Sequence, residues 1–410
     1  MEGDLDHLNA EDIQEEIILE DGSQNPEDDY MEAESKDDDN DIGLDEEETL
    51  EDANLEEFAD DSIQGFFEHH EPVYAVAIHP IDQSMVCSGG GDDVAYLWNM
   101  STGETLCKLK GHSDSVVSVS FSVDGNYIAS GGMDGKVIVS STADGQLTCE
   151  LEGPDEVTVY IVSIVAQLTT QFLCWHPRGP VLVAGSADGS LWMWSLPDGR
   201  FMHVFNGHAA SVSHGSFTPD GKLLVSASED ASLIVWDPKS GSLISRFSTE
   251  VGHFHQSPIN TFAISQDSHT IVTGSQDFSS IIVNISTGRI IGSLGEHTES
   301  VESIDICDSM GFFATASVDN TVKVWDGVSL RVRHTLKHED AVTKIQFIKN
   351  STILVTGSAD KNIRLWESRT GECVKTLKGH QAAILDFSIN GGRLVAGSDD
   401  GTALVFDLSF

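Results

Sequence analysis

EHTESVESIDICDSMGFFATASVDNTVKVWD (296–326) is the stretch that decides the fold of this 410-residue chain. Apolar and polar residues alternate in three short runs, VESIDI, FFATAS and TVKVWD, which are separated by turns at DSMG and VDN. This period of two predicts three antiparallel β-strands. Asp319 follows His297 by 22 residues and precedes Trp325 by 6, and these two distances locate further copies of the unit.

The same distances recur along most of the chain. Turn aspartates mark eight copies, at Asp92, Asp134, Asp188, Asp230, Asp277, Asp319, Asp360 and Asp400. Counting back 22 residues reaches His70, His112, His208, His255, His297 and His338, whereas His380 precedes its aspartate by 20. Six residues after the aspartate stand Trp98, Trp194, Trp236, Trp325 and Trp366. Four residues before it stand Ser88, Ser130, Ser226, Thr273, Thr315 and Thr356, with Ala184 and Ala396 as exceptions.

These repeated residues resemble the WD-repeat family. The resemblance covers residues 62–410 and is carried by the Gly-His pairs, the Ser-x-Asp turns and the Trp-Asp pairs at 236–237 and 325–326. It implies an all-β, eight-bladed WD40 β-propeller. The residues agree, because a weaker fourth run such as ETLCKLKGH (104–112) completes a four-stranded sheet in each copy. Small sheets of this kind bury their faces by stacking around an axis.

The last copy ends on its third run, so its fourth strand has to come from elsewhere. The segment SIQGFFE (62–68) precedes the first repeat histidine and belongs to no copy. We expect it to pair with the last strand and close the ring, which removes an open sheet edge. The chain then divides into an acidic tail at 1–61 and a propeller at 62–410.

Two copies are longer than the others. The third contains 12 additional residues within EVTVYIVSIVAQLTTQ (156–171), an apolar and β-branched segment. Three explanations fit this insert: an extended hairpin, a partner site or a splicing irregularity. The sequence does not distinguish among them. The fifth copy has five additional residues near STEVGHFHQ (248–256).

Negative charge is concentrated at the N-terminus. Residues 1–61 contain 28 acidic residues and one basic residue, Lys36, in a chain whose net charge is −45. Acidic blocks such as DDDNDIGLDEEE (37–48) predict a disordered tail, because they bury too little apolar surface to offset chain entropy. The charge disfavours nucleic acids and anionic membranes and favours a basic protein partner.

Location and cofactors follow from what the sequence lacks. Six scattered cysteines without a CxxC pair, no signal peptide and no long apolar stretch predict a cytoplasmic protein, with the nucleus as a second location, and no membrane insertion. The 16 histidines show no zinc-ligand spacing, and the glycine-rich turns lack the lysine of a phosphate loop. We therefore expect no metal and no cofactor, and we expect a monomer.

The recurring His, Ser/Thr and Asp could be mistaken for a hydrolase triad. A catalytic set is needed once, however, whereas this set recurs with a tryptophan, which favours a buried hydrogen-bond network. In the WD-repeat family such sets are structural tetrads. The candidates are His112, Ser130 and Asp134; His208, Ser226, Asp230 and Trp236; His297, Thr315, Asp319 and Trp325; and His338, Thr356, Asp360 and Trp366. No catalytic residue is expected.

The variable neighbours of these residues are the candidates for function. Propellers bind partners through the loops after each repeat histidine and around each turn aspartate. There we find Glu71, Asp114, Asp155, Glu156, Glu229, Glu299, Glu339, Asp340 and Asp399, and no Lys or Arg at the corresponding places. A ring of carboxylates would attract a basic peptide. The alternative is that these are solvated turn residues, since Asp and Glu are common in turns.

The layout of the whole chain narrows the resemblance. The acidic N-terminus, eight repeats, CWHPRGPVLVAGSADGSLWMWSLPDG (174–199) and the ending VAGSDDGTALVFDL are similar to the angio-associated migratory cell protein family. Its fungal counterpart is a dedicated chaperone of a large-subunit ribosomal protein. The resemblance implies a non-enzymatic chaperone of a basic ribosomal protein in 60S ribosome biogenesis. The alternative is a general scaffold in signalling, cell migration or ubiquitin-ligase complexes.

Overall fold

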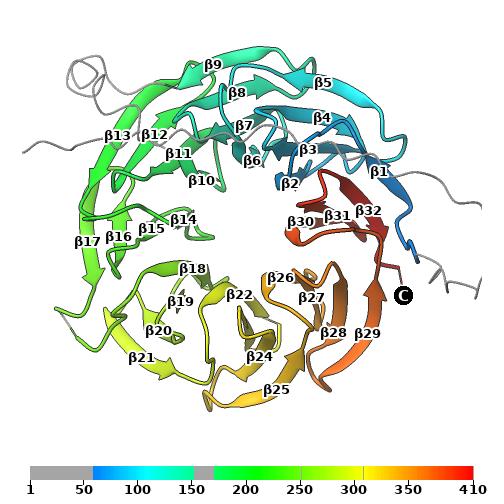
Figure 1. Cartoon of the computed structure of the whole chain (residues 1–410). Helices are drawn as coiled ribbons and strands as arrows, with labels where there is room; N and C mark the ends of the chain where they lie inside the picture. Colours follow the sequence, from blue (N-terminus) through cyan, green and yellow to red (C-terminus); the bar gives the residue numbers. More distant parts are fainter. Residues whose placement is uncertain (1–58, 152–169, 251, 308, 410) are drawn as a thin grey trace, which may run out of the picture. The chain divides into compact units, whose positions relative to one another are not determined.

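The structure, a computed structural model, describes residues 59–151, 170–250, 252–307 and 309–409. These residues form 32 β-strands and no helix, so the described part of the chain has no apolar helix of membrane-spanning length. The strands make eight four-stranded antiparallel sheets, arranged as blades around a central axis (Figure 1). The predicted eight-bladed β-propeller is confirmed. Most of the predicted tail, residues 1–58, lies outside the described residues.

The blades are numbered in chain order, and the first strand of each lies nearest the axis. Blade 1 is β2 (Val73–Ile78), β3 (Met85–Gly90), β4 (Ala95–Asn99) and β5 (Thr105–Leu109). Blade 2 is β6 (Val116–Phe121), β7 (Tyr127–Gly132), β8 (Val137–Ser141) and β9 (Leu147–Leu151). Blade 3 is β10 (Thr170–Trp175), β11 (Val181–Ser186), β12 (Ser190–Ser195) and β13 (Arg200–Asn206). Blade 4 is β14 (His214–Phe217), β15 (Leu224–Ala227), β16 (Leu233–Asp237) and β17 (Ser242–Phe247).

The second half of the ring repeats this order. Blade 5 is β18 (Ile259–Ile264), β19 (Thr270–Ser275), β20 (Ser280–Asn284) and β21 (Arg289–Leu294). Blade 6 is β22 (Val301–Cys307), β23 (Phe312–Ser317), β24 (Thr321–Asp326) and β25 (Val332–Lys337). Blade 7 is β26 (Val342–Phe347), β27 (Ile353–Ser358), β28 (Ile363–Glu367) and β29 (Glu372–Leu377). Blade 8 is β30 (Ile384–Asn390), β31 (Arg393–Ser398), β32 (Ala403–Asp407) and β1 (Gln64–Phe66).

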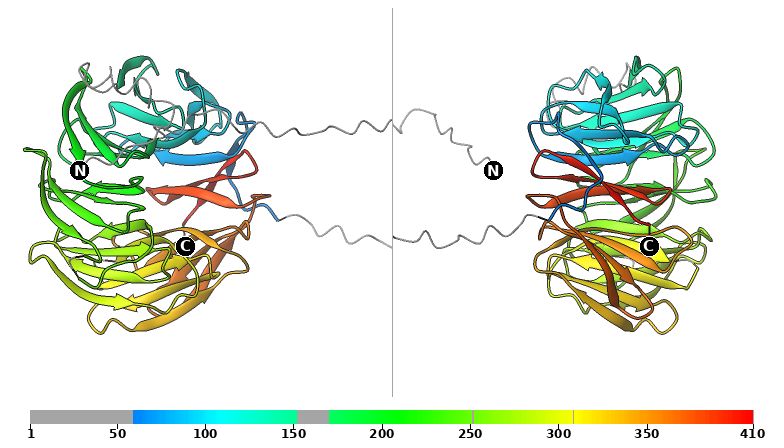
Figure 2. Two further views of the ribbon diagram at one scale, coloured as in Figure 1. Left: turned by 60° about the vertical axis from the view of Figure 1, so that its left-hand side comes forward. Right: turned by 90° about the vertical axis from the view of Figure 1, so that its right-hand side faces the viewer.

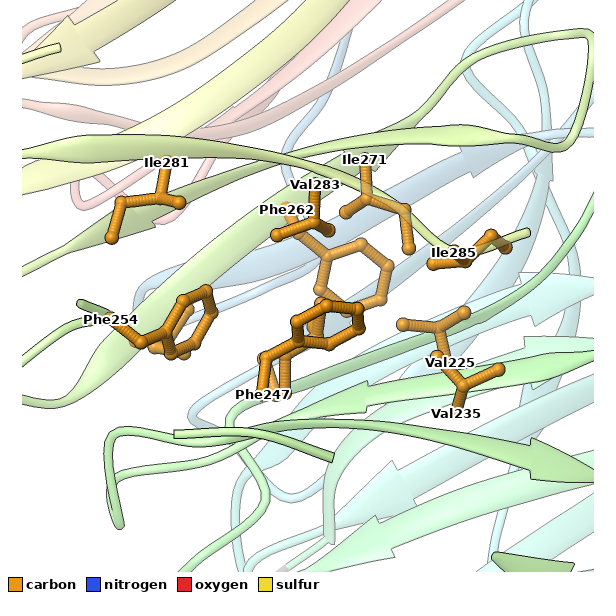
Figure 3. Close-up of a cluster of buried hydrophobic side chains, with 12 residues drawn as sticks. Val225, Val235, Phe247, Phe254, Phe262, Ile271, Ile281, Val283 and Ile285 are labelled. Carbon is orange, nitrogen blue, oxygen red and sulfur yellow. The ribbon is translucent and has the colours of Figure 1, made fainter. Parts of the chain in front are cut away.

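Burial across each blade follows from the stacking. All six residues of β23, FFATAS, are buried, because the neighbouring blades cover both faces of the sheet. The outermost strands are different, and β21 leaves Arg289, Ile290 and Ile291 exposed. The core is therefore divided into clusters between blades. In Figure 3, Val225, Val235 and Phe247 of blade 4 meet Phe262, Ile271 and Val283 of blade 5.

The ring is closed by the first described strand. β1 pairs antiparallel with β32, with Gln64 opposite Val405 and Phe66 opposite Ala403. Phe66 is fully buried and stacks on Trp98 of blade 1, with 4.9 Å between ring centroids. Both views of Figure 2 show this blue strand beside the red strands at the end of the chain. The strand is shorter than the range 62–68 suggested by the sequence.

Residues 59–61, which the sequence placed in the tail, belong to the propeller. The backbone N–H of Asp61 donates to the carbonyl of Lys378 at 2.8 Å. The N–H of Lys378 in turn donates to the Asp61 carboxylate at 2.9 Å. Two hydrogen bonds therefore fix the chain just before β1.

The two long copies have different outcomes. The segment 156–171, which contains the additional residues of blade 3, lies outside the described residues apart from the two residues that begin β10. In blade 5 the longer connection brings in Phe254, which is buried against Phe247 at a centroid distance of 6.0 Å. Part of this longer connection is therefore core.

Candidate functional site

The loop that enters each blade is tied to the turn between its second and third strands. In blade 6, His297 Nδ1 lies 2.9 Å from Asp319 Oδ2, and Nε2 lies 2.7 Å from Thr315 Oγ1. Trp325 Nε1 donates to the same hydroxyl at 2.9 Å. Because the hydroxyl of Thr315 is fully buried, this chain of hydrogen bonds presents no nucleophile to solvent.

The same contacts recur in blade 4. His208 Nδ1 lies 3.2 Å from Asp230 Oδ2, and Nε2 lies 2.8 Å from Ser226 Oγ. Trp236 Nε1 donates to Ser226 Oγ at 2.8 Å. The structure therefore brings all four sequence candidates of this blade together.

Blades 2 and 5 make the contacts without the tryptophan. In blade 2, His112 Nδ1 lies 3.1 Å from Asp134 Oδ1, and Nε2 lies 2.9 Å from Ser130 Oγ. Blade 5 joins His255 to Asp277 and Thr273 in the same way. The histidine and aspartate thus hold loop and turn together whether or not a tryptophan is present.

In blade 1 the histidine expected from the spacing is wrong by one residue. His69, not His70, lies 2.9 Å from Asp92 and 2.9 Å from Ser88, and His70 is exposed. The cause is the turn between β2 and β3, residues 79–84, which is one residue longer than the turn 122–126 of blade 2. With two adjacent histidines, a fixed spacing selects the wrong one.

Blade 7 contains a fifth participant that the spacing did not identify. Thr356 Oγ1 lies 3.0 Å from His338 Nε2, and Trp366 Nε1 donates to Thr356 at 3.0 Å. His338 Nδ1 and Asp360 Oδ2, however, are 3.5 Å apart. Arg364 donates to His338 Nδ1 at 2.6 Å and also contacts the Asp360 carboxylate, so it joins the two. The sequence did contain a signal for this participant, because Arg364 is a charged residue at a position where the third strands of most other blades are apolar.

Blade 8 leaves one imidazole nitrogen unpaired. His380 Nδ1 lies 3.0 Å from Asp400 Oδ2, but Nε2 is buried with no hydrogen-bond partner. The reason is Ala396, which occupies the place where other blades have a hydroxyl and whose side chain is fully buried.

The charge states of the tetrads follow from burial and hydrogen bonding. Burial raises the pKa of the Asp319 carboxyl, but hydrogen bonds from Thr321 and His297 outweigh it and hold the pKa below its usual value. Burial lowers the pKa of His297 and of His338. At neutral pH the His297 imidazole is therefore neutral, and its Nδ1–H donates to an ionised Asp319.

The exposed carboxylates cluster beside these ties. In seven blades, the residue before the turn aspartate donates its backbone N–H to the carbonyl of the third residue after the repeat histidine, as Val318 does to Ser300 at 3.0 Å. Two positions adjoin this bond: the donor residue itself, directly before the turn aspartate, and the second residue after the repeat histidine. Both lie close to the first strand, which lines the axis (Figure 1). Acidic residues at either place therefore lie on one face of the ring.

We call this set the carboxylate ring. It has one exposed member in each of six blades: Glu71, Asp114, Glu229, Glu299, Asp340 and Asp399, in blades 1, 2, 4, 6, 7 and 8. Neither place holds Lys or Arg in any described blade. Blade 5 interrupts the ring with Ser257 and Gln276, and the entry loop of blade 3, with Asp155 and Glu156, lies outside the described residues. Glu339 is exposed beside Asp340, one residue closer to the repeat histidine His338.

A separate cavity is lined by residues of blades 4, 5, 6 and 7. Its volume is about 320 Å³, and His214, Asp305 and Lys344 are among its lining residues. Lys344 pairs with Asp386, and Asp305 accepts the backbone N–H of Phe347 at 2.6 Å. Burial lowers the pKa of His214 to about 4. These charges link neighbouring blades, so the cavity is part of the scaffold.

Metal binding has no candidate in the part of the chain that the structure describes, where no three His, Cys, Asp or Glu side chains form a suitable group. This leaves the carboxylate ring as the strongest candidate functional site. What it can do is electrostatic, because six carboxylates on one face attract cationic groups.

Comparison with known proteins gives the repeats a family. The model of the WD domain, G-beta repeat, matches residues 61–99, 103–141, 169–195, 199–237, 244–282, 288–326, 330–367 and 371–407. The human angio-associated migratory cell protein is 33% identical over 364 residues, which cover 85% of this chain and 80% of that protein. The Saccharomyces cerevisiae ribosome assembly protein SQT1 is 26% identical over 410 residues, with 91% of each chain covered.

A solved structure adds a bound partner. The structure of Chaetomium thermophilum Sqt1 bound to the N-terminus of ribosomal protein L10 is similar, with a TM-score of 0.77 and 25% identity. The match covers 85% of this chain and all of that one.

Proposed function

The chain belongs to the WD40-repeat family and is related to the angio-associated migratory cell protein and to Sqt1, and from this premise we propose that it is a chaperone of a basic large-subunit ribosomal protein. Members of the family are typically non-catalytic binding proteins. In this proposal the carboxylate ring captures the N-terminal segment of a protein of the L10 type. Binding takes place in the cytoplasm, with the nucleus as a second location, and serves assembly of the 60S subunit.

The observation that carries the proposal is the distribution of charge in the ring. One exposed carboxylate per blade, in six blades, comes from two different places in the turn and loop. A repeated turn motif alone would place acidic residues at one position. A negative face around the axis attracts an extended cationic segment and speeds its association. The structure of Sqt1 with the L10 N-terminus supports the same class of partner.

The test is binding of a synthetic peptide of the L10 N-terminus to the full chain. We expect a one-to-one complex at low salt. The triple variant Asp114→Lys, Glu299→Lys, Asp340→Lys should weaken it about 100-fold or more, because it converts three attractive contacts into repulsive ones.

A matched control distinguishes this face from net charge. Glu104, Asp144 and Asp198 are exposed in the turns between third and fourth strands, at the opposite end of blades 1, 2 and 3. Their replacement by Lys changes the net charge equally and should leave the affinity within about twofold. Equal losses in both triple variants, or no complex with the wild-type chain, would contradict the proposed function.

A further inference from the structure

Phe278 is the one bulky aromatic residue that the described blades hold in a left-handed turn conformation. It follows the turn aspartate of blade 5, with a φ of 67°, and the residue is 42% exposed. All eight turns have a positive φ at this place, where the other blades carry Asp93, Gly135, Gly189, Ala231, Asn320, Lys361 and Gly401. Glycine, asparagine and aspartate tolerate this conformation, whereas an aromatic residue is strained in it.

Packing does not compensate this strain as it does elsewhere. Leu330 also has a positive φ, of 57°, but it is half-buried and packs against the core cluster that contains Phe313 and Trp325. Phe278 contributes to no buried cluster and no aromatic pair among the described residues. Single exposed apolar residues are ordinary on protein surfaces, but a strained and exposed one suggests a functional constraint.

The place of Phe278 relates it to the carboxylate ring. In blade 6, the equivalent Asn320 accepts the backbone N–H of His338 at 2.9 Å, so this turn position borders the loop that enters the next blade. For Phe278 that loop is 295–300, which carries the ring member Glu299. On the other side lies the interruption of the ring at Ser257 and Gln276. An aromatic side chain therefore stands where the negative face changes to a neutral one.

We propose that Phe278 is a specificity-determining contact that receives an apolar side chain of the bound segment at the interruption of the carboxylate ring. The inference rests on the proposed function, because it assumes that the ring binds a basic segment. It adds that the segment is mixed, with an apolar residue between basic ones. Aromatic residues on a rigid turn are well suited to anchor such a contact.

The experiment uses the full chain to select from a display library of random ten-residue peptides. We expect the wild-type chain to enrich Arg and Lys together with one apolar position. Phe278→Asn should keep the basic preference and lose the apolar one, with affinity for a selected wild-type peptide about tenfold lower. Phe278→Trp should retain both the apolar preference and the affinity. Leu243→Asn, at a similarly exposed apolar site on β17, should change neither of them.

A stability measurement separates this from a structural role. Because asparagine accepts the left-handed conformation, Phe278→Asn should leave the melting temperature unchanged or raised. A lowered melting temperature, or an apolar preference that Phe278→Asn retains, overturns the inference. So does selection of basic peptides without any apolar position. If the chain selects apolar peptides without basic residues, the result contradicts the proposed function instead. Loss of the apolar preference in Phe278→Asn would then still support a contact between Phe278 and the peptide.

Discussion

A buried ring nitrogen without a hydrogen-bond partner costs stability, and His380 has one. Its Nε2 is buried and unpaired opposite Ala396. We expect Ala396→Ser to supply the hydroxyl found in other blades and to raise the free energy of unfolding by about 1 kcal/mol. Urea unfolding measures it.

The control for this substitution is Ala184→Ser in blade 3. Ala184 is equally buried, but that copy has Gly153-Pro154 where others have Gly-His. The new hydroxyl then lacks the histidine partner and should give no comparable stabilisation. Stabilisation of both variants would show that the histidine is not the reason.

A complete tetrad should be costly to break. Thr315→Val keeps the shape of the side chain but leaves Trp325 Nε1 and His297 Nε2 buried without their shared partner. We expect a loss of about 3 kcal/mol in the free energy of unfolding, with peptide binding retained in the folded protein. Thr298→Val, at an exposed site in the same loop, should cost less than about 0.5 kcal/mol. Loss of binding without loss of stability would contradict a structural role.

The buried histidines predict how stability depends on pH. The pKa of His214, lowered to about 4 by burial, and those of His297 and His338 lie below the value of about 6.5 in the unfolded chain. The unfolded state then binds more protons, so stability is full above pH 6.5 and is lost as pH falls from there towards 4.

The aspartates extend this loss to lower pH. Hydrogen bonds hold the pKa of Asp134 and Asp319 below the usual value despite burial, so their contribution disappears only below about pH 4. We expect the melting temperature to fall in two steps between about pH 7 and pH 3. A melting temperature that rises between pH 7 and pH 5 would contradict the direction for the histidines.

At the scale of the element, β1 is a three-residue strand that completes a blade assembled from both ends of the chain. Removal of residues 62–68 exposes the edge of β32 and uncovers Trp98, so it should lower the melting temperature far more than removal of residues 1–55. The milder change Phe66→Ala should cost about 3–5 kcal/mol, because the ring is fully buried. Equal melting temperatures of the two truncated chains would refute the role of β1 in closure.

The elements also show how far the sequence could be interpreted. Copy number and strand order follow from a spacing that each blade must keep for its histidine to reach its aspartate. Because the turn 79–84 has one additional residue, the spacing selected His70 as the repeat histidine of blade 1 instead of His69. Arg364 was missed because its contact with Asp360 depends on where the third strand places it.

At the scale of the whole molecule, the ring of blades converts local differences into one surface. Six of the eight copies each contribute one exposed carboxylate from one of two places, and the sequence named these residues as candidates. It could not show that the two places adjoin, because that depends on the backbone hydrogen bond between turn and loop. The interruption at blade 5 follows from the same hydrogen bond, because it identifies Ser257 and Gln276 as the corresponding residues of that blade. The scaffold is set by what the copies share, and the charge of this face by what differs between them.

This surface predicts how binding should respond to salt. Attraction between an extended cationic segment and carboxylates spread over six blades acts before contact, and ions screen it within about 8 Å at physiological ionic strength. The association rate constant of the L10 peptide should therefore fall at least tenfold between about 0.05 and 0.5 M salt, and the dissociation rate should change much less. Stopped-flow fluorescence measures both rates.

Two triple variants provide the control for this prediction. Lys at positions Asp114, Glu299 and Asp340 should remove most of the salt dependence of association. Lys at positions Glu104, Asp144 and Asp198 should leave it unchanged. A salt dependence confined to the dissociation rate would mean that the ring acts through close contacts alone.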